Sequence, residues 1–231
     1  MTRHLFFDLG ETLVRYYSRG QFQATLPTLL KKLYTALEKR LPGPIDHYWS
    51  ALQAENHENP DFSVRKLELR LANIFNISEE TVTEEGLCDL FLSEMLKVSS
   101  IYEDTIGTLK ALFGRYELAL VSNTPWGSPK HYFEDELARY GINRYLKNAI
   151  FCREVGYRKP HRKIFEYALE RTGAKAAETI MIGDRYEWDV VGARQCGMNA
   201  ILVDREGTSK DDCMKIKTLS ELLEIRLGGT A

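Results

Sequence analysis

Polar side chains stand after three short apolar runs of the sequence, at points where β-strands would end. They are Asp8, Ser122 with Asn123, Asp184 and, five residues after Asp184, Asp189. In an open parallel sheet, ligands bind outside the carboxyl ends of the strands, so these side chains are expected to converge on one edge of the sheet. Taken singly, each has an ordinary structural role, because Asp residues cap helices and serine hydroxyls occur in turns.

The convergence of three carboxylates predicts a metal site. Like charges on one sheet edge repel each other unless a cation lies between them, and oxygen ligands suit Mg²⁺. Lys159 precedes a helical pattern and brings a positive charge to the same edge, whereas a lysine taken alone would be a solvated surface charge. The group as a whole therefore indicates a Mg²⁺ site with an ammonium group beside it.

Five apolar runs predict the strands that position these residues. Each run is about four residues long and rich in branched side chains, which is typical of parallel strands. The runs are residues 4–7, 118–121, 149–151, 179–182 and 200–203. Helical patterns separate the later runs, and Gly173 and Gly197 stand where helices would end. The sequence therefore predicts an α/β protein with an open parallel sheet.

Residues 16–98 follow a different pattern, with apolar residues at helical spacing and no strand-like run. Four helices are predicted there, the first with an apolar stripe at Phe22, Leu26, Leu29, Leu30, Leu33 and Leu37. Because the strand before Asp8 has no place except in the sheet, this segment must be an insertion between the first two strands. We expect a discontinuous core of residues 1–15 and 99–231 and an all-helical domain of residues 16–98.

Composition excludes several classes of protein. The 31 Lys and Arg residues balance 33 Asp and Glu residues, and the formal net charge of −2 argues against binding nucleic acid by electrostatic attraction. No apolar run approaches the roughly 18 residues that span a bilayer, and Asp8 and Glu11 interrupt the stretch that a signal peptide would need. The sequence predicts a cytoplasmic protein without nucleic-acid or membrane partners, either a monomer or a homodimer.

Four motifs resemble those of the haloacid dehalogenase superfamily. They occur in the order Asp8-x-x-x-Thr12, the apolar run to Ser122, Lys159-Pro160, and Gly183-Asp184-x-x-x-x-Asp189 followed by Gly192-Ala193 and Gly197-Met198. The resemblance covers about residues 1–14 and 100–205. It implies a Rossmann-like sheet with a helical cap of the C1 type inserted after the first motif.

The resemblance also implies roles for the matched residues. Asp8 would be the nucleophile that attacks phosphorus and forms an aspartyl-phosphate, which water then hydrolyses. Asp8, Asp184, Asp189 and the main-chain carbonyl of Gly10 would hold Mg²⁺.

Two further matched residues would contact the substrate. Ser122 and Lys159 would hold the oxygens of the transferring phosphoryl group, because a cation and fixed donors stabilise its spread negative charge. Asn123, beside Ser122, and Arg15, just after the first motif, are further candidates for binding a small phosphorylated substrate.

One position departs from the phosphatase pattern. Two residues after the nucleophile these phosphatases usually have a second Asp, which protonates the leaving oxygen and later activates water, and this chain has Gly10. Glycine retains the main-chain carbonyl for the metal, but general acid catalysis is typically worth about 10²- to 10⁴-fold in rate. Glu11 is near in sequence and is expected to point away from the pocket.

The favoured function is a Mg²⁺-dependent phosphatase of a small phosphorylated metabolite, with three alternatives open. A 2-haloacid dehalogenase would use Asp8 without metal, but the charge of Asp184 would oppose an anionic substrate. A phosphonatase-like hydrolase would need a lysine in the cap that the sequence does not place. A binding or regulatory module, with catalysis weakened at Gly10, would have no need of the converging charges.

Overall fold

The chain forms two compact units in the computed structural model, which describes residues 2–17, 19–225 and 227. Unit 1 consists of Met1–Arg15, Ser100–Thr124 and Lys130–Ala231, and unit 2 consists of Tyr16–Ser99 and Pro125–Pro129. The sequence pattern places the short segment 125–129 in the core, whereas unit 2 contains it. This segment is grouped with the helical residues because its contacts lie there.

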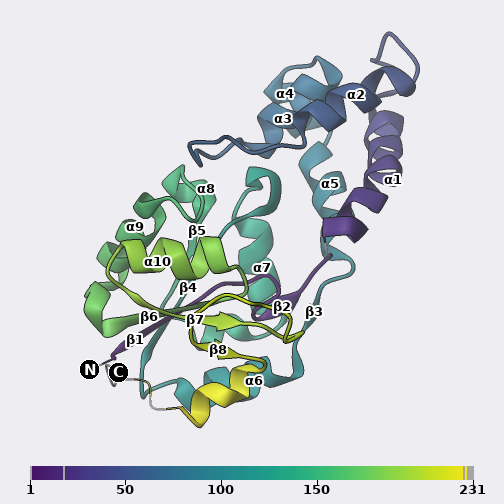
Figure 1. Cartoon of the computed structure of the whole chain (residues 1–231). Helices are drawn as coiled ribbons and strands as arrows, with labels where there is room; N and C mark the ends of the chain where they lie inside the picture. Colours follow the sequence, from purple (N-terminus) through teal and green to yellow (C-terminus); the bar gives the residue numbers. More distant parts are fainter. Residues whose placement is uncertain (1, 18, 226, 228–231) are drawn as a thin grey trace. The chain divides into compact units, whose positions relative to one another are not determined.

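A six-stranded parallel sheet forms the centre of unit 1 (Figure 1). Its order is β5 (Asn148–Phe151), β4 (Glu117–Ser122), β1 (His4–Phe7), β6 (Thr179–Gly183), β7 (Asn199–Val203) and β8 (Lys215–Ile216). All five predicted strands are confirmed, and so is the Rossmann-like α/β fold. The two-residue strand β8 is not predicted by the sequence, because a run that short carries no periodicity.

The register of the central strand brings the polar strand ends together. Phe7, the last residue of β1, lies opposite Leu120 of β4 and Ile182 of β6. The side chains of β1 from Leu5 to Phe7 are fully buried, as expected for a strand with neighbours on both sides. The residues that follow β1, β4 and β6 therefore lie at the same edge of the sheet.

Helices connect the strands of unit 1. They are α6 (Glu103–Leu112), α7 (His131–Arg139), α8 (Cys152–Val155), α9 (Arg162–Thr172) and α10 (Gly192–Gln195), with a π-helical turn at Tyr186–Val191. Gly173, with φ of 67°, follows the last residue of α9, as the sequence predicts. The helix begins at Arg162, three residues after Lys159, which confirms that Lys159 precedes a helix. A short antiparallel pair, β2 (Val14–Arg15) and β3 (Ser100–Ile101), completes this unit.

Unit 2 is helical, with five helices among its described residues. They are α1 (Arg19–Leu37), α2 (Asp46–Glu55), α3 (Leu67–Phe75), α4 (Glu79–Glu84) and α5 (Leu87–Leu96). The predicted stripe of α1 is buried at Leu29, Leu33 and Leu37. The sequence does not predict helix α4, because this short helix buries only one residue, Val82, and therefore shows no apolar stripe. None of the helices in the described part of the chain has the length and apolar character that a membrane crossing requires.

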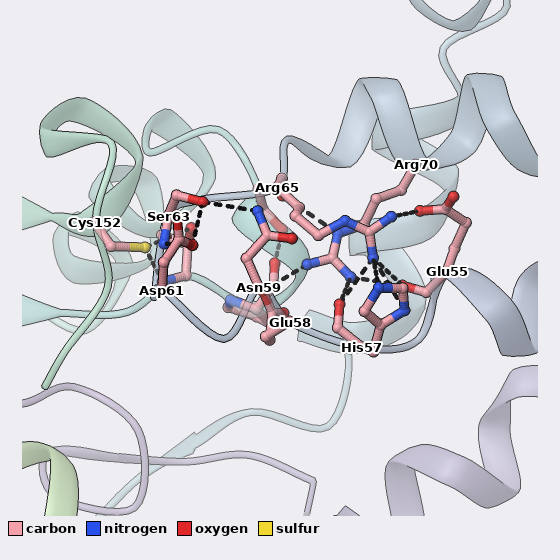
Figure 2. Close-up of polar contacts among 12 residues, drawn as sticks. Glu55, His57, Glu58, Asn59, Asp61, Ser63, Arg65, Arg70 and Cys152 are labelled. Carbon is pink, nitrogen blue, oxygen red and sulfur yellow. Dashed lines mark hydrogen bonds and ion pairs between the residues drawn. The ribbon is translucent and has the colours of Figure 1, made fainter. Parts of the chain in front are cut away.

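Arginine side chains hold the irregular loop between α2 and α3 (Figure 2). The guanidinium of Arg70, which is 1% exposed, donates to the main-chain oxygens of Glu55 and His57, both at 2.7 Å, and pairs with Glu58 at 2.6 Å. Arg65 donates to the same His57 oxygen at 3.0 Å. These bonds satisfy main-chain carbonyls that no helix or strand serves, and they compensate the burial of the guanidinium.

The segment Pro125–Pro129 belongs to unit 2 through its tryptophan. The ring of Trp126 lies 5.0 Å from that of Phe91 and 6.3 Å from that of Phe22, centroid to centroid. The Arg70 guanidinium lies 5.2 Å from the Trp126 centroid. Aromatic and cation–π contacts of this kind each contribute about 0.5–1.5 kcal/mol beyond burial. These contacts attach the segment Pro125–Pro129 to unit 2, although it follows closely on β4 in the sequence.

Candidate active site

The candidate active site lies in unit 1, at the carboxyl ends of β1, β4 and β6. Asp8 follows β1, Ser122 ends β4, and Asp184 follows β6. Oxygens of Asp8, Asp184 and Asp189 all lie within 4.8 Å of one another. The structure thus brings together the three carboxylates that the sequence placed at one edge of the sheet.

Lys159 lies at the centre of this group. Its ammonium donates to Asp8 Oδ1 at 2.6 Å, to Asp189 Oδ1 at 2.6 Å and to the main-chain oxygen of Val121 at 2.8 Å. An ammonium group has three donors, so all three are engaged. Lys159 is 1% exposed, and this complete set of partners is what makes its burial tolerable. Contact with a phosphoryl oxygen would require one of these bonds to be exchanged.

Asn123 fixes the main chain of Lys159. Its Oδ1 accepts from the Lys159 amide at 2.8 Å, and its Nδ2 donates to the Lys159 carbonyl at 3.2 Å. The sequence suggested Asn123 as a substrate ligand, whereas the structure shows its amide bound to this residue. Ser122 is 3% exposed, and its hydroxyl donates to the Asn123 carbonyl at 3.2 Å. The end of β4 therefore positions the lysine.

Asp189 reaches the site because Gly183 has no side chain. A Cβ at Gly183 would lie 2.3 Å from the Asp189 carboxyl carbon, closer than atoms can approach. Asp189 is 1% exposed, and its Oδ2 accepts from the Arg185 amide at 3.0 Å while Oδ1 accepts from Lys159. The π-helical turn over Tyr186–Val191 carries Asp189 back over the end of β6. The glycine at the start of the motif Gly183-Asp184-x-x-x-x-Asp189 thus has a steric reason.

The electrostatics of the site show excess negative charge. Burial, followed by the charges of Asp8 and Asp189, raises the pKa of Asp184 to about 8. Burial also raises the pKa of Asp189 to about 6, against the opposing effect of Lys159. Burial would lower the pKa of Lys159, but the charges of Asp189 and Asp8 outweigh it, so this pKa is raised. One ammonium does not neutralise three carboxylates.

This donor set fits a divalent cation. Carboxylate oxygens at one focus are the ligands that Mg²⁺ prefers, and raised carboxyl pKa values mark a site where a cation would be stabilised. Asp8, Asp184 and Asp189 would supply the carboxylate oxygens. Arg185 pairs with Asp184 at 3.2 Å, but its side chain is 57% exposed, so water screens that pair.

A first prediction concerns the stability of the metal-free protein. Unfolded Asp carboxyls titrate near pKa ~3.9, so between about pH 4 and 8 the folded site keeps protons that the unfolded chain releases. The free energy of unfolding should therefore fall as pH rises through this window. Each unit of raised pKa corresponds to about 1.4 kcal/mol, so in EDTA the melting temperature should drop by several degrees between pH 5 and 8.

Two variants and the addition of Mg²⁺ test whether the carboxylates of the site cause this pH dependence. Asp184→Asn should remove most of the pH dependence, while Asp212→Asn, at an exposed position, should leave it unchanged. Mg²⁺ should raise the melting temperature more at pH 8 than at pH 5, because the metal binds deprotonated carboxylates. A wild-type melting temperature that does not change with pH in EDTA would contradict the assigned electrostatics.

The loop after Asp8 leads through the remaining candidate residues, which are Gly10, Glu11 and Arg15. Gly10 forms an isolated bridge with Val14, and the left-handed backbone of the loop lies at Glu11, with φ of 55°. The Glu11 carboxylate accepts from the Tyr102 hydroxyl at 2.7 Å. The Arg15 guanidinium lies 4.8 Å from the centre of the same ring. The side chains of Glu11 and Arg15 therefore meet at Tyr102.

Comparison with known proteins identifies the family. Residues 2–197 match the model of the haloacid dehalogenase-like hydrolases. The chain belongs to the haloacid dehalogenase-like hydrolase family. The family resemblance stated from the four motifs is thereby confirmed, as is the expectation of a hydrolase.

Relatives and solved structures of the haloacid dehalogenase-like hydrolases agree with this assignment. The glyceraldehyde 3-phosphate phosphatase of Methanothermobacter thermautotrophicus is 32% identical over 168 residues, covering 65% of this chain and 73% of that protein. A haloacid dehalogenase (HAD) phosphatase of Thermococcus onnurineus superposes with a TM-score of 0.67 at 26% identity, covering 96% and 97% of the two chains. A 2-haloacid dehalogenase of Pseudomonas syringae pv. Tomato DC3000 has a TM-score of 0.70 at 24% identity over 97% of both chains. The last similarity shows a shared fold.

Proposed function

We propose that this hydrolase is a Mg²⁺-dependent phosphatase that cleaves a small phosphorylated metabolite through an aspartyl-phosphate on Asp8. The observation that carries the proposal is the buried cluster in which Lys159 binds Asp8 and Asp189 beside Asp184. The similarity to a phosphatase of a small sugar phosphate supports the substrate class. Unit 2 would act as the cap that selects the substrate.

The chemistry divides among the residues of the site. An oxygen of the Asp8 carboxylate attacks phosphorus, the bond from phosphorus to the leaving oxygen breaks, and water later cleaves the aspartyl-phosphate. Lys159 orients the Asp8 carboxylate through Oδ1 and leaves Oδ2 for the attack. A bound Mg²⁺, held by Asp8, Asp184, Asp189 and the Gly10 carbonyl, would supply positive charge that stabilises the equatorial phosphoryl oxygens. Ser122 would donate to one of those oxygens.

Proton transfer to the leaving group has no residue assigned to it in this proposal. Gly10 stands where an acid would serve, and the carboxylate of Glu11 is bound to Tyr102. The leaving oxygen would therefore take its proton from water. This arrangement suits substrates whose leaving group departs without a proton, such as acyl or anomeric phosphates.

Turnover of an aryl phosphate with and without Mg²⁺ tests the proposal. We expect hydrolysis that requires Mg²⁺ and is lost in EDTA. Release of halide from a 2-haloacid, independent of Mg²⁺, would instead show a dehalogenase. Cleavage of a phosphonate in preference to phosphate esters would show a phosphonatase. No turnover of any of these by a folded, Mg²⁺-saturated protein would favour a binding module.

A further inference from the structure

A second polar network in unit 1 surrounds the loop that follows Asp8. Arg205, two residues beyond β7, donates through Nη2 to the carbonyl of Thr12 at 2.6 Å and through Nε to that of Glu11 at 3.4 Å. The side chain of Arg205 is 18% exposed. A single guanidinium therefore binds two successive carbonyls of the loop.

Asp104 holds the guanidinium in place. Its two carboxylate oxygens accept from Nη1 and Nη2 of Arg205 at 3.0 and 3.2 Å, a bidentate pair. Asp104 lies in the first turn of α6 and also accepts from the Leu219 amide at 2.7 Å, so its carboxylate has three bonds. Bidentate pairs between a guanidinium and a carboxylate are strong and fix orientation as well as distance.

Tyr102 and Thr105 complete the support. The Arg205 guanidinium lies 3.6 Å from the centre of the Tyr102 ring, and the Tyr102 hydroxyl donates to Glu11. Burial and the hydrogen bond to Glu11 raise the pKa of Tyr102 to about 12, which keeps this hydroxyl a donor. The Thr105 hydroxyl donates to the Leu13 carbonyl at 2.8 Å. Three successive loop carbonyls, from Glu11 to Leu13, are thus bound by groups outside the loop.

The same loop carries the residues on which the proposed chemistry depends. Internal bonds close it, since the amides of Leu13 and Val14 both donate to the Leu9 carbonyl, at 2.9 and 3.0 Å. Gly10 has no side chain through which it could be held, so its carbonyl direction depends on the neighbours on either side. The Arg205 bonds fix the residues directly after it.

We infer that Arg205 is a positioning residue, which clamps the Glu11 and Thr12 carbonyls and thereby orients the loop carrying Asp8 and Gly10. The inference rests on the proposed function for its catalytic consequence. A misplacement of about 1 Å in a catalytic group can reduce the rate by about 10²-fold, so a loosened loop should lower kcat more than it changes KM.

Hydrogen exchange and kinetics of three variants test the clamp. Arg205→Met keeps the aliphatic stem and removes the guanidinium. Arg205→Lys keeps the charge but lacks the planar fork that binds two carbonyls and a carboxylate at once. Arg139→Met is the matched control, because Arg139 of α7 pairs with Glu136 at 2.9 Å and lies 4.6 Å from the Tyr140 ring, away from this loop in sequence.

Amide exchange in the ligand-free protein provides a readout that is independent of activity. In Arg205→Met and Arg205→Lys, the amides of Glu11, Leu13 and Val14 should exchange at least about tenfold faster than in wild type, while those of β4 and β6 stay unchanged. Arg139→Met should exchange as wild type at the loop. Wild-type exchange at the loop in Arg205→Met, or equal acceleration across the sheet, would overturn the inference.

Kinetics with an aryl phosphate provide the second readout. Both Arg205 variants should lose about tenfold or more in kcat with a change in KM below about threefold. If Arg205→Lys keeps full kcat and exchanges like wild type, then the positive charge alone holds the loop. That result would overturn the inference that the planar guanidinium fork is the cause. Absence of turnover in wild type would refute the proposed function, while the exchange result would still decide whether Arg205 clamps the loop.

Discussion

Asp8→Asn should lower phosphatase turnover by about 10⁴-fold or more while leaving the fold intact. The amide is nearly the same shape as the carboxylate, but it cannot act as the nucleophile. It also removes one negative charge that faces Asp184 and Asp189, so the sheet has no new repulsion to accommodate. Initial rates with an aryl phosphate in saturating Mg²⁺ measure the loss, and circular dichroism checks the fold.

The nucleophile itself can be observed in the wild-type protein. Acid quenching during turnover, followed by digestion and mass spectrometry, should find the phosphoryl group on the peptide that contains Asp8. Asp135→Asn, an exposed position of α7, is the control and should retain full activity. Retention of more than a few per cent of activity in Asp8→Asn, or phosphorylation at another residue, would refute the assignment.

The rate of the wild-type protein should depend steeply on the leaving group, and Gly10→Asp should reduce that dependence. Without an acid at position 10 the departing oxygen carries nearly full negative charge, so aryl and acyl phosphates should outrun alkyl phosphates. Gly10→Asp should raise the rate with alkyl phosphates by up to about 10²-fold and change aryl phosphates little. In this loop the left-handed backbone lies at Glu11 and not at Gly10, so the substitution does not place a side chain on left-handed backbone.

A series of phosphate esters with graded leaving-group pKa measures this effect. Gly10→Asn is the matched control, because it adds a side chain of the same size that cannot donate a carboxyl proton, and it should give no gain. A flat dependence in the wild-type protein would show that another acid already protonates the leaving group. Equal gains in Gly10→Asp and Gly10→Asn would attribute the effect to the loop and not to proton transfer.

The sheet could be predicted from the sequence because its strands are buried on both faces. Continuous apolar runs such as residues 118–121 and 179–182 are typical of buried parallel strands, and both lie in strands of the sheet. Helix α1 is equally clear from its stripe. Helix α4 and strand β8 are not predictable in this way, since their few residues carry too little pattern and depend on the contacts around them.

The residue types and strand ends of the candidate site were determined by the sequence alone. Asp8, Ser122 and Asp184 stand at the ends of apolar runs, and parallel strands bring those ends to one edge of the sheet. Asp189 stands five residues after Asp184 and reaches the same edge through the π-helical turn. The hydrogen bonds of Asn123 to the main chain of Lys159 were not predictable from its position. Whether an amide faces a ligand or a neighbouring main chain depends on the geometry of a segment 36 residues away.

The tertiary structure alone decided the contacts that join distant segments. The bonds of Arg205 to residues 11 and 12 span more than 190 positions, and the attachment of Trp126 to unit 2 joins it to residues on both α1 and α5. No local spacing encodes such partners, because hydrogen bonds and ring contacts depend on distance in space. Sequence pattern therefore determined which groups reach the edge of the sheet, and tertiary packing determined which of them hold one another there.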